Sequence, residues 1–336
     1  MSDRRAPTPA FGISLWESLD APTILHEVQV AEQSGFDAVW LGDSQLLWRE
    51  AYVLLGAASA LTTRVLLGVG VTNPVTRHPT VTASALLTLQ EASRGRALMG
   101  VGVGSTAVRT LGQQPVSRAE LARWVDLVRA LWSGEPVSTA DGAWRLAFGA
   151  PGSSAPIVVA GRGPRMLRLA GEIGDGAIIT GSARAGPGLR ERLDWVQEGR
   201  GAAGPPPRSF RTCLSIAAAV HPDRRKAFEA VRPQVAVGLV RPQGELSDLA
   251  RQASERLRTS YDYSQHMSAQ ARYAELIPDA IVPEFALAGT PDECVQQLRD
   301  LQPVGLDEIT LSPYAVEGGT RADTIAALAR DVIARL

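Results

Sequence analysis

Apolar runs without polar alternation recur along the chain, and between them lie longer segments in which apolar residues return every three or four positions. Residues 65–71 form one such run, which is typical of a strand buried on both faces. A polar turn follows, and residues 80–87 then have helical spacing. A glycine and then an aspartate also precede three of the apolar runs, with the aspartates at positions 37, 175 and 307. This repetition predicts a parallel sheet with crossover helices.

Eight segments have the character of buried strands. They are residues 11–16, 37–41, 65–71, 96–102, 156–160, 176–181, 210–220 and 307–312. Eight parallel strands with helices between them, in one chain of 336 residues, favour a closed (β/α)8 TIM barrel over an open sheet. Apolar residues keep helical spacing from residue 325 to the C-terminus, as expected of a last helix that packs beside the first strand.

Three segments lie outside the repeat. Residues 1–10 are predicted to form a disordered tail, and residues 11–336 a single barrel domain. Within that domain, the Gly- and Pro-rich stretch 182–209 predicts a mobile loop around a short helix. Residues 221–288 predict a long helical insertion between the seventh and eighth strands.

The composition is that of an ordinary globular protein, with 45% hydrophobic and 21% charged residues. A net charge of −1 gives no electrostatic basis for binding nucleic acid or an anionic membrane. No apolar stretch approaches the ~18 residues of a membrane span, and the start of the chain has no signal-peptide core. The two cysteines, Cys213 and Cys294, fit a reducing compartment. We therefore expect a cytoplasmic protein whose partner is a small molecule.

Hydrolytic and metal chemistry have little support in the sequence. The four histidines form no metal-binding pattern, and no G-x-S-x-G nucleophile motif is present. The single lysine, Lys226, lies among charged residues typical of an exposed helix, which argues against Schiff-base chemistry. We expect no bound metal ion.

The candidate chemistry lies at the carboxyl ends of the predicted strands, where parallel α/β folds hold their ligands. Asp43 directly follows the second strand, so its carboxylate is expected at the barrel mouth, either as a site residue or as a helix N-cap. His78 stands before Pro79 at the start of a helix, either as a ligand contact or as a cap or packing residue.

Two glycine-rich turns are candidate anion cradles. Gly102, Gly104 and Ser105 follow the fourth strand, and backbone N–H groups there could approach a phosphate, although the full dinucleotide fingerprint is missing. The second turn follows the fifth strand and runs from Ala160 through Gly161, Arg162, Gly163, Pro164 and Arg165 to Met166. Its N–H groups and two arginines would suit a phosphate, and the alternative is an ordinary tight turn with solvated arginines.

Four segments carry a resemblance to a known family. They are GVTNPVTRHP at 70–79, SRGRA at 93–97, GRGPRML at 161–167 and LAGEIGDG at 169–176. Together these ordered motifs resemble the bacterial luciferase-like superfamily, and most closely its coenzyme F420-dependent methylenetetrahydromethanopterin reductase branch. The resemblance runs from about residue 11 to 180, resumes at 285–291 and extends to residue 313.

This resemblance implies a (β/α)8 barrel, usually a homodimer, that holds a reduced flavin or 5-deazaflavin at the carboxyl ends of its strands. It places a non-prolyl cis peptide bond between Gly70 and Val71, with Thr72 beside them as a further cofactor contact. It places the acidic contact at Asp43 and the phosphate contacts on the two glycine-rich turns.

The function implied by the resemblance is hydride transfer between coenzyme F420 and an organic substrate, with Asp43 as the acid and Ser14 or Tyr314 as helpers. Two positions depart from the family pattern and bear on the substrate, because Ser44 replaces a histidine and Ser14 replaces a glutamate. One alternative is an FMNH2-dependent monooxygenase that uses O2 and receives its FMN from a separate reducing enzyme. Another is a noncatalytic barrel that binds a flavin.

Overall fold

The computed structural model of the chain describes residues 8–16, 19–139, 142–180, 183–203, 210–240, 246–260 and 276–336. Within them, eight parallel strands close into a barrel, as predicted. In barrel order they are β1 (Ala10–Leu15), β2 (Ala38–Leu41), β3 (Leu66–Thr72), β4 (Ala97–Val101), β7 (Ile157–Gly161), β8 (Gly176–Thr180), β9 (Arg211–Val220) and β11 (Glu308–Pro313). The ring closes because β9 pairs with both β8 and β11, and β11 pairs with β1.

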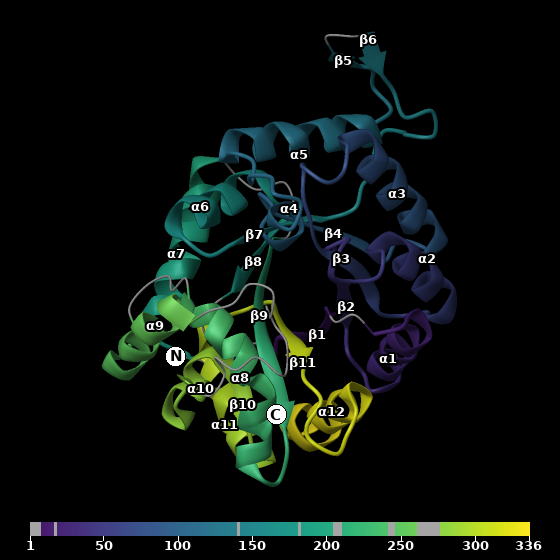
Figure 1. Cartoon of the computed structure of the whole chain (residues 1–336). Coiled ribbons are helices and arrows are strands. Elements are labelled where there is room, and N and C mark those ends of the chain that lie inside the picture. Colours follow the sequence, from purple (N-terminus) through teal and green to yellow (C-terminus); the bar gives the residue numbers. More distant parts are fainter. Residues whose placement is uncertain are drawn as a thin grey trace, which may run out of the picture.

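Helices surround the barrel on its outside (Figure 1). They are α1 (Ala21–Gln33), α2 (Ala51–Leu61), α3 (Pro79–Ala92), α5 (Arg118–Trp132), α6 (Pro164–Ile173), α7 (Pro187–Ala202), α11 (Pro291–Leu301) and α12 (Arg321–Ala327). The short helix α4 (Thr106–Arg109) lies nearer the centre of this view. Ser117 and Thr290 start α5 and α11 with capping boxes, which explains where these helices begin. A buried ion pair joins the last helix to the first, with Arg321 Nε 2.9 Å from Glu27 Oε1.

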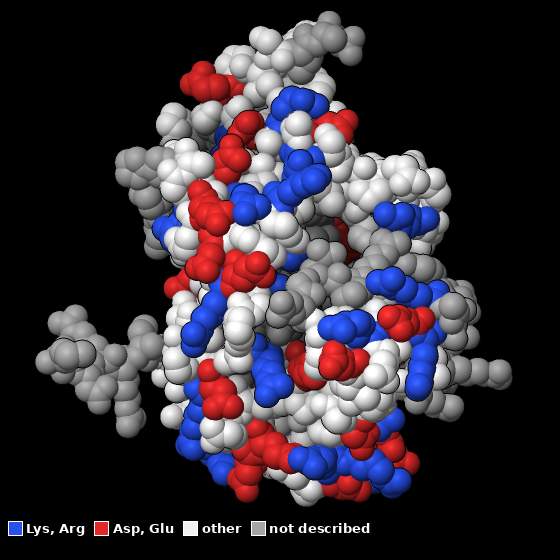
Figure 2. All heavy atoms as spheres, turned by 90° about the vertical axis from the view of Figure 1, so that its left-hand side faces the viewer, with Lys and Arg blue, Asp and Glu red and all other residues white. Residues whose placement is uncertain are grey.

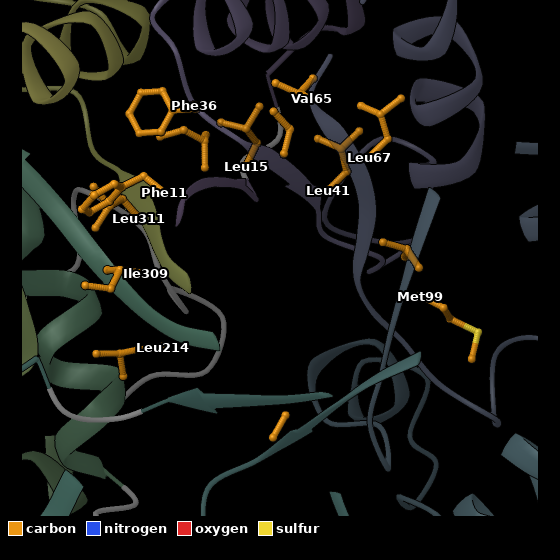
Figure 3. Close-up of a cluster of buried hydrophobic side chains, with 14 of the residues drawn as sticks. Phe11, Leu15, Phe36, Leu41, Val65, Leu67, Met99, Leu214, Ile309 and Leu311 are labelled. Carbon is orange, nitrogen blue, oxygen red and sulfur yellow. The ribbon is translucent and has the colours of Figure 1, made fainter. Parts of the chain in front are cut away.

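The main hydrophobic core lies between the strands and the surrounding helices. Every second strand residue contributes to it, including Leu15, Leu41, Leu67, Met99 and Leu311, each at most 3% exposed. Figure 3 shows these side chains distributed around the ring of strands. Full burial of one such side chain contributes roughly 1.5–3 kcal/mol, so this layer holds the helices to the barrel.

Trp40 fills the centre of the barrel because the strands beside it carry glycines. A Cβ atom on Gly68 would lie well inside 3.0 Å of the Trp40 ring. One on Gly70 would lie 3.1 Å from Trp40 Cβ, and one on Gly100 would lie 3.3 Å from the ring. The glycines within the apolar runs of β3 and β4 therefore make room for one large side chain, which is 2% exposed.

A fully buried carboxylate, that of Glu308, lies in the same interior. Its Oε1 accepts hydrogen bonds from Trp40 Nε1 at 2.9 Å and from the Thr310 hydroxyl, and its Oε2 accepts from Arg211 Nε at 2.6 Å. A Cβ atom on Gly12 would collide with this carboxylate. The charge is therefore both paired and hydrogen-bonded, as a buried carboxylate requires.

The three aspartates of the repeated glycine–aspartate motif lie at the amino ends of the strands, which we call the floor of the barrel. Each carboxylate accepts an N–H at the start of the neighbouring strand, from Phe11 at 2.9 Å, Ile157 at 2.9 Å and Thr212 at 2.7 Å. Each aspartate also donates its own N–H to that strand and accepts, at its backbone C=O, an N–H from the strand on its other side. Asp37, Asp175 and Asp307 thus each connect three strands.

Helix α7 corrects the prediction of a mobile loop with a short helix at 182–209. Its 16 residues pack against α6, and residues 182 and 204–209 lie outside the described part of the chain. One glycine in each helix permits this close packing. A Cβ atom on Gly171 of α6 would collide with the backbone of Val196, and one on Gly199 of α7 with the backbone of Arg168.

The predicted insertion between the seventh and eighth barrel strands is largely helical. It contains α8 (Arg224–Val240), α9 (Asp248–Ser260) and α10 (Val282–Phe285), with their own hydrophobic cluster, while residues 241–245 and 261–275 lie outside the described part. It ends in a strand that we did not predict, β10 (Ala286–Gly289), which pairs with the far end of β9.

A second unpredicted element is the hairpin of β5 (Val137–Thr139) and β6 (Gly142–Trp144), which projects beyond the ring of helices in Figure 1. The ring of Trp144 packs edge-on against His78, with 4.7 Å between the ring centroids. His78 also caps α3 by accepting the backbone N–H of Thr80. His78 is therefore a cap and packing residue, one of the two roles expected from its position.

Residues 1–7 of the predicted tail lie outside the described residues, and Ala10 already belongs to β1, where it pairs with Glu308. On the face shown in Figure 2, acidic and basic side chains are interspersed, in keeping with the net charge of −1. None of the described helices is long and apolar enough to cross a membrane.

Candidate functional site

The carboxyl ends of the barrel strands form the mouth at which we predicted the site. The Gly70-Val71 peptide bond is cis, as predicted, and the pairing of β3 with β4 shifts register between Val69 and Thr72. Val71 is half-buried here and packs, with Ala160 of β7, against the interior cluster around Trp40. The mouth therefore has an apolar surface formed by Val71 and Ala160.

Asp43 lies next to this surface, directly after β2, and is 8% exposed. Its Oδ2 accepts a hydrogen bond from the Thr72 hydroxyl at 2.8 Å and lies 3.4 Å from Arg77 Nε. Asp43 caps no helix, because the side chain that caps α2 is that of Glu50. The carboxylate is thus an acceptor held between the ends of β2 and β3.

Arg77 connects Asp43 to a larger polar cluster. It pairs with Glu50 as well, and its guanidinium lies 4.0 Å from the centroid of the Tyr52 ring. Burial raises the pKa of Tyr52 and the negative charge of Asp43 raises it as well, while side-chain hydrogen bonding with Thr72 and Thr82 lowers it. The net shift is upward, so the phenol stays protonated.

The first glycine-rich turn packs beside the same surface. Gly102 donates its N–H to the backbone O of Thr72 at 3.1 Å, and a Cβ atom on it would sit 3.5 Å from Val71 and 4.0 Å from Ala160. Gly104 has a φ of +90°, a conformation that favours glycine. Ser105 precedes α4 but makes no side-chain cap. The turn thus brings backbone close to the apolar surface with no side chain in between.

The second glycine-rich turn leads from β7 into α6. Pro164 is the first residue of this ten-residue helix, and its N-cap, Gly163, makes no side-chain hydrogen bond. A Cβ atom on Gly161 would lie 3.1 Å from Leu167 and Met166, so the turn is tight. An uncapped helix N-terminus with exposed N–H groups attracts anions, which agrees with a cradle at this turn.

The arginine in this second turn points toward a cavity. Arg162 Nε donates to Thr180 Oγ1 at 2.9 Å, and both side chains line a cavity. Trp16, Ser215, Gln234, Phe285 and Ser312 are among its other lining residues. It therefore lies between the ends of β1, β8, β9 and β11 and the helical insertion.

The two predicted helper residues lie on the edge of this cavity rather than in its lining. The Ser14 hydroxyl, 4% exposed, accepts a hydrogen bond from the indole N–H of Trp16. The Tyr314 hydroxyl donates to Gln234 Oε1 at 3.3 Å. Each is therefore one hydrogen bond away from a side chain that lines the cavity.

Two tryptophans at the mouth were missed by the sequence analysis. Trp16 directly follows β1 and lies edge-on to Trp48, with 6.1 Å between the ring centroids. Trp48 lines a second cavity, of about 330 Å³, together with Asp43, Arg77 and others. The aromatic pair thus stands between the two cavities. An available signal was that Trp16 is the last residue of a predicted strand.

No metal centre is formed by the described residues. Among them, no group of three or more His, Cys, Asp or Glu side chains is placed to hold an ion. Both cysteines are buried, and burial raises the pKa of the Cys294 thiol to about 12.

The fold and the site were compared with known proteins. A family model for luciferase-like monooxygenases matches residues 11–308. A 5,10-methylenetetrahydromethanopterin reductase from Archaeoglobus fulgidus is 29% identical over 338 residues, which cover 97% of this chain and 99% of the relative. An F420-dependent glucose-6-phosphate dehydrogenase from Beutenbergia cavernae is 35% identical over 228 residues, or 62% of this chain and 68% of the relative.

Among solved structures, the coenzyme F420 dependent tetrahydromethanopterin reductase from Methanopyrus kandleri has the same fold, with a TM-score of 0.80. It is 24% identical, and the match covers 98% of this chain and 99% of that one. The chain therefore belongs to the luciferase-like monooxygenase family, and it is an oxidoreductase.

Proposed function

We propose that the protein transfers a hydride between coenzyme F420 and an organic substrate. When bound, F420 supplies a deazaflavin ring that carries the hydride at its C5. The glucose-6-phosphate dehydrogenase and the solved tetrahydromethanopterin reductase are both named for F420, and the Archaeoglobus reductase aligns with nearly the whole chain. These similarities support F420 ahead of FMN.

The observation that carries the proposal is the irregular end of β3. Its register shift leaves Val71 and Ala160 as an apolar surface, and the Asp43–Thr72 hydrogen bond lies beside it. A planar ring with polar edges fits this combination. A Cβ atom on Gly102 would enter the space beside Val71 and Ala160, so glycine keeps that space open.

We assign the predicted contacts to two parts of the cofactor. The ring would contact Asp43, Gly70, Val71 and Thr72. The anionic tail would meet the backbone of the two turns, at Gly102, Gly104, Ser105, Ala160, Gly161, Arg162, Gly163 and Pro164. The uncapped start of α6 supports this assignment, because its N–H groups attract negative charge.

Asp43 is the proposed proton-handling residue. Its carboxylate is held in place by the Thr72 hydroxyl and by Arg77, and it accepts hydrogen bonds. It would take the proton when the substrate is oxidised and return it when the substrate is reduced. Ser14 and Tyr314 are the proposed helpers. The presence of Ser14 and Ser44, where the reductase branch has glutamate and some relatives have histidine, favours a substrate other than methylenetetrahydromethanopterin.

Fluorescence titration with F420 and with FMN, at low and high ionic strength, tests the cofactor. We expect F420 to bind more tightly, and the preference to weaken as salt screens the exposed contacts of its tail. Turnover is then measured with alcohols, aldehydes and imines. Tighter binding of FMN at both ionic strengths, with O2-dependent product formation, would contradict the proposal and favour the monooxygenase. Binding without any turnover would favour the noncatalytic flavin-binding barrel.

We further propose that the protein is a cytoplasmic homodimer and that residues 11–336 act as one domain. Leu46, Val53 and Val81, near the packed helices α2 and α3, are 63%, 70% and 51% exposed, and a second copy would cover them. Light scattering after size-exclusion chromatography tests this, and a monomeric mass would contradict it. A separate cofactor-reducing enzyme is expected as a partner only if the cofactor is FMN.

A further inference from the structure

Two arginines converge on the residue that ends β8. Arg162, directly after β7, donates from Nε to Oγ1 of Thr180 at 2.9 Å. Arg192, in α7, donates from Nη1 to the backbone O of the same residue at 3.3 Å. Two guanidinium groups from separate elements therefore meet at the two oxygen atoms of one threonine.

The second of these arginines is inside the protein. Arg192 is 4% exposed, so its charge is screened little by water. Burial is the largest cause that lowers its pKa, and the positive charge of Arg162 lowers the pKa further. The negative charge of Glu191 raises the pKa. Two positive charges that lie close together in a partly desolvated environment create a positive electrostatic potential, which favours the binding of an anion nearby.

The cavity next to Arg162 lies between the barrel strands β8, β9 and β11 and the helical insertion. Among the residues that the structure describes in its lining, Arg162 is the one charged side chain. Trp16 and Phe285 contribute aromatic surface, and Ser215 and Ser312 contribute hydroxyl groups from β9 and β11. The cavity thus has a positive end, an aromatic wall and neutral hydrogen-bonding groups.

We propose that this cavity binds a small organic acid, with its carboxylate on Arg162 and its apolar body against Trp16 and Phe285. The planar guanidinium matches the two oxygens of a carboxylate. Arg192 contributes positive potential from behind Thr180 without touching the ligand. The Arg162 side chain faces the cavity, whereas its backbone belongs to the turn that would meet the cofactor tail. The identification of the acid as the substrate rests on the proposed function. The binding of an acid in this cavity does not depend on that function.

Benzoate and benzamide are suitable probes because they share one ring and differ mainly in charge. Isothermal titration of the wild-type protein is expected to give at least tenfold tighter binding of benzoate. Arg162→Gln is expected to weaken benzoate binding about tenfold and to leave benzamide within twofold. Arg165→Gln is the matched control, because Arg165 is an exposed arginine in the first turn of α6, and it should change neither affinity.

A second variant tests the buried charge. Arg192→Gln is expected to weaken benzoate binding about threefold and to leave benzamide unchanged, since the residue acts through the potential. If a variant fails to fold, the wild-type affinity ratio and its decline with added salt decide the question. Equal affinity for the two probes, or equal loss of both in Arg162→Gln, would overturn the proposal.

Saturating F420 distinguishes the two sources of an acid group. If the acid belongs to the substrate, benzoate binds the F420 complex as it binds the free protein. Competition between F420 and benzoate would assign the cavity to the acidic tail of the cofactor and overturn the proposal. Titration with F420 alone tests the proposed function separately. If F420 did not bind, the affinity for benzoate and its dependence on Arg162 would still support the proposed acid site.

Discussion

The carboxylate of Glu308 accepts the indole N–H of Trp40 at 2.9 Å in the centre of the barrel, although the two residues are 268 positions apart. The same carboxylate pairs with Arg211, so this one group connects β2, β9 and β11. Trp40 in turn occupies the space left by Gly68 and Gly70. The hydrogen bond therefore fixes the ring that supports β3 from inside the barrel.

Glu308→Gln should destabilise the fold strongly. The amide keeps the shape of the side chain but removes the charge that faces Arg211, and removing one partner of a buried pair costs about 3 kcal/mol. Urea unfolding followed by circular dichroism measures the change. Glu198→Gln is the control, because Glu198 pairs with Arg168 where the two side chains are 53% and 46% exposed. It should cost less than ~1 kcal/mol, and equal losses in the two variants would contradict this account.

Asp43→Asn should lower turnover far more than stability. A group that handles the proton contributes about 10²–10⁴-fold to the rate, so kcat is expected to fall by about 10² or more. Asp37→Asn makes the same chemical change at the floor of the barrel, and it should leave kcat within about twofold. Steady-state kinetics and thermal unfolding of both variants give the comparison. If the Asp43→Asn variant kept the full kcat, Asp43 would serve only as a structural acceptor for the Thr72 hydroxyl.

Two glycines of α7, two positions apart, should respond to alanine in opposite directions. Gly199→Ala places a Cβ atom far inside 3.0 Å of the backbone of Arg168, so it should destabilise the protein by about 3 kcal/mol. Gly201→Ala has nothing within 4 Å of the new atom and should stabilise the helix by about 0.5–1 kcal/mol. Differential scanning calorimetry resolves the two signs. Similar shifts in both variants would show that α6 and α7 are not in close contact.

Glu32 should make stability depend on pH in the acid range. Burial alone would raise its pKa, but the backbone N–H groups of Val65, Arg64 and Thr63 stabilise the carboxylate and lower the pKa from 4.5 to about 2. The stabilisation is therefore complete above about pH 4.5 and is lost as the pH falls through about 2. Glu32→Gln should cost about 1–2 kcal/mol at pH 6 and nothing near pH 2. A constant difference from pH 6 to pH 2 would contradict this assignment.

The barrel could be predicted because each of its strands is a local pattern. An apolar run such as 65–71 is sufficient evidence for a strand, and the closing strands at 210–220 and 307–312 carry the same signal. The full length of helix α7 could not be predicted, because Gly199 lowers helix propensity and its fit depends on the neighbouring helix. The hairpin formed by β5 and β6 is too short to give a periodic pattern.

The site could be predicted only in part. Asp43 and the glycine-rich turns follow strands, so their place at the mouth is a local inference. The cavity beside Arg162 draws on side chains as distant in sequence as Trp16 and Ser312, and no local pattern brings these together.

The motif at 93–97 has a structural explanation. Arg96 donates to the backbone O atoms of Val65 at 2.8 Å and Thr62 at 2.9 Å, and so holds the end of α2. This part of the resemblance therefore reflects how the barrel is built, and only the segments at the mouth bear on chemistry.

The three floor aspartates have a consequence for how such a barrel can change. Asp37, Asp175 and Asp307 each hold three strands at the amino end, and together they hold every barrel strand except β4. The inward or outward direction of the residues in those strands is therefore set before the chain reaches the mouth. Loops at the mouth can then be lengthened, shortened or exchanged without a strand slipping. A library built on this chain should therefore vary the mouth loops freely and keep these three carboxylates fixed.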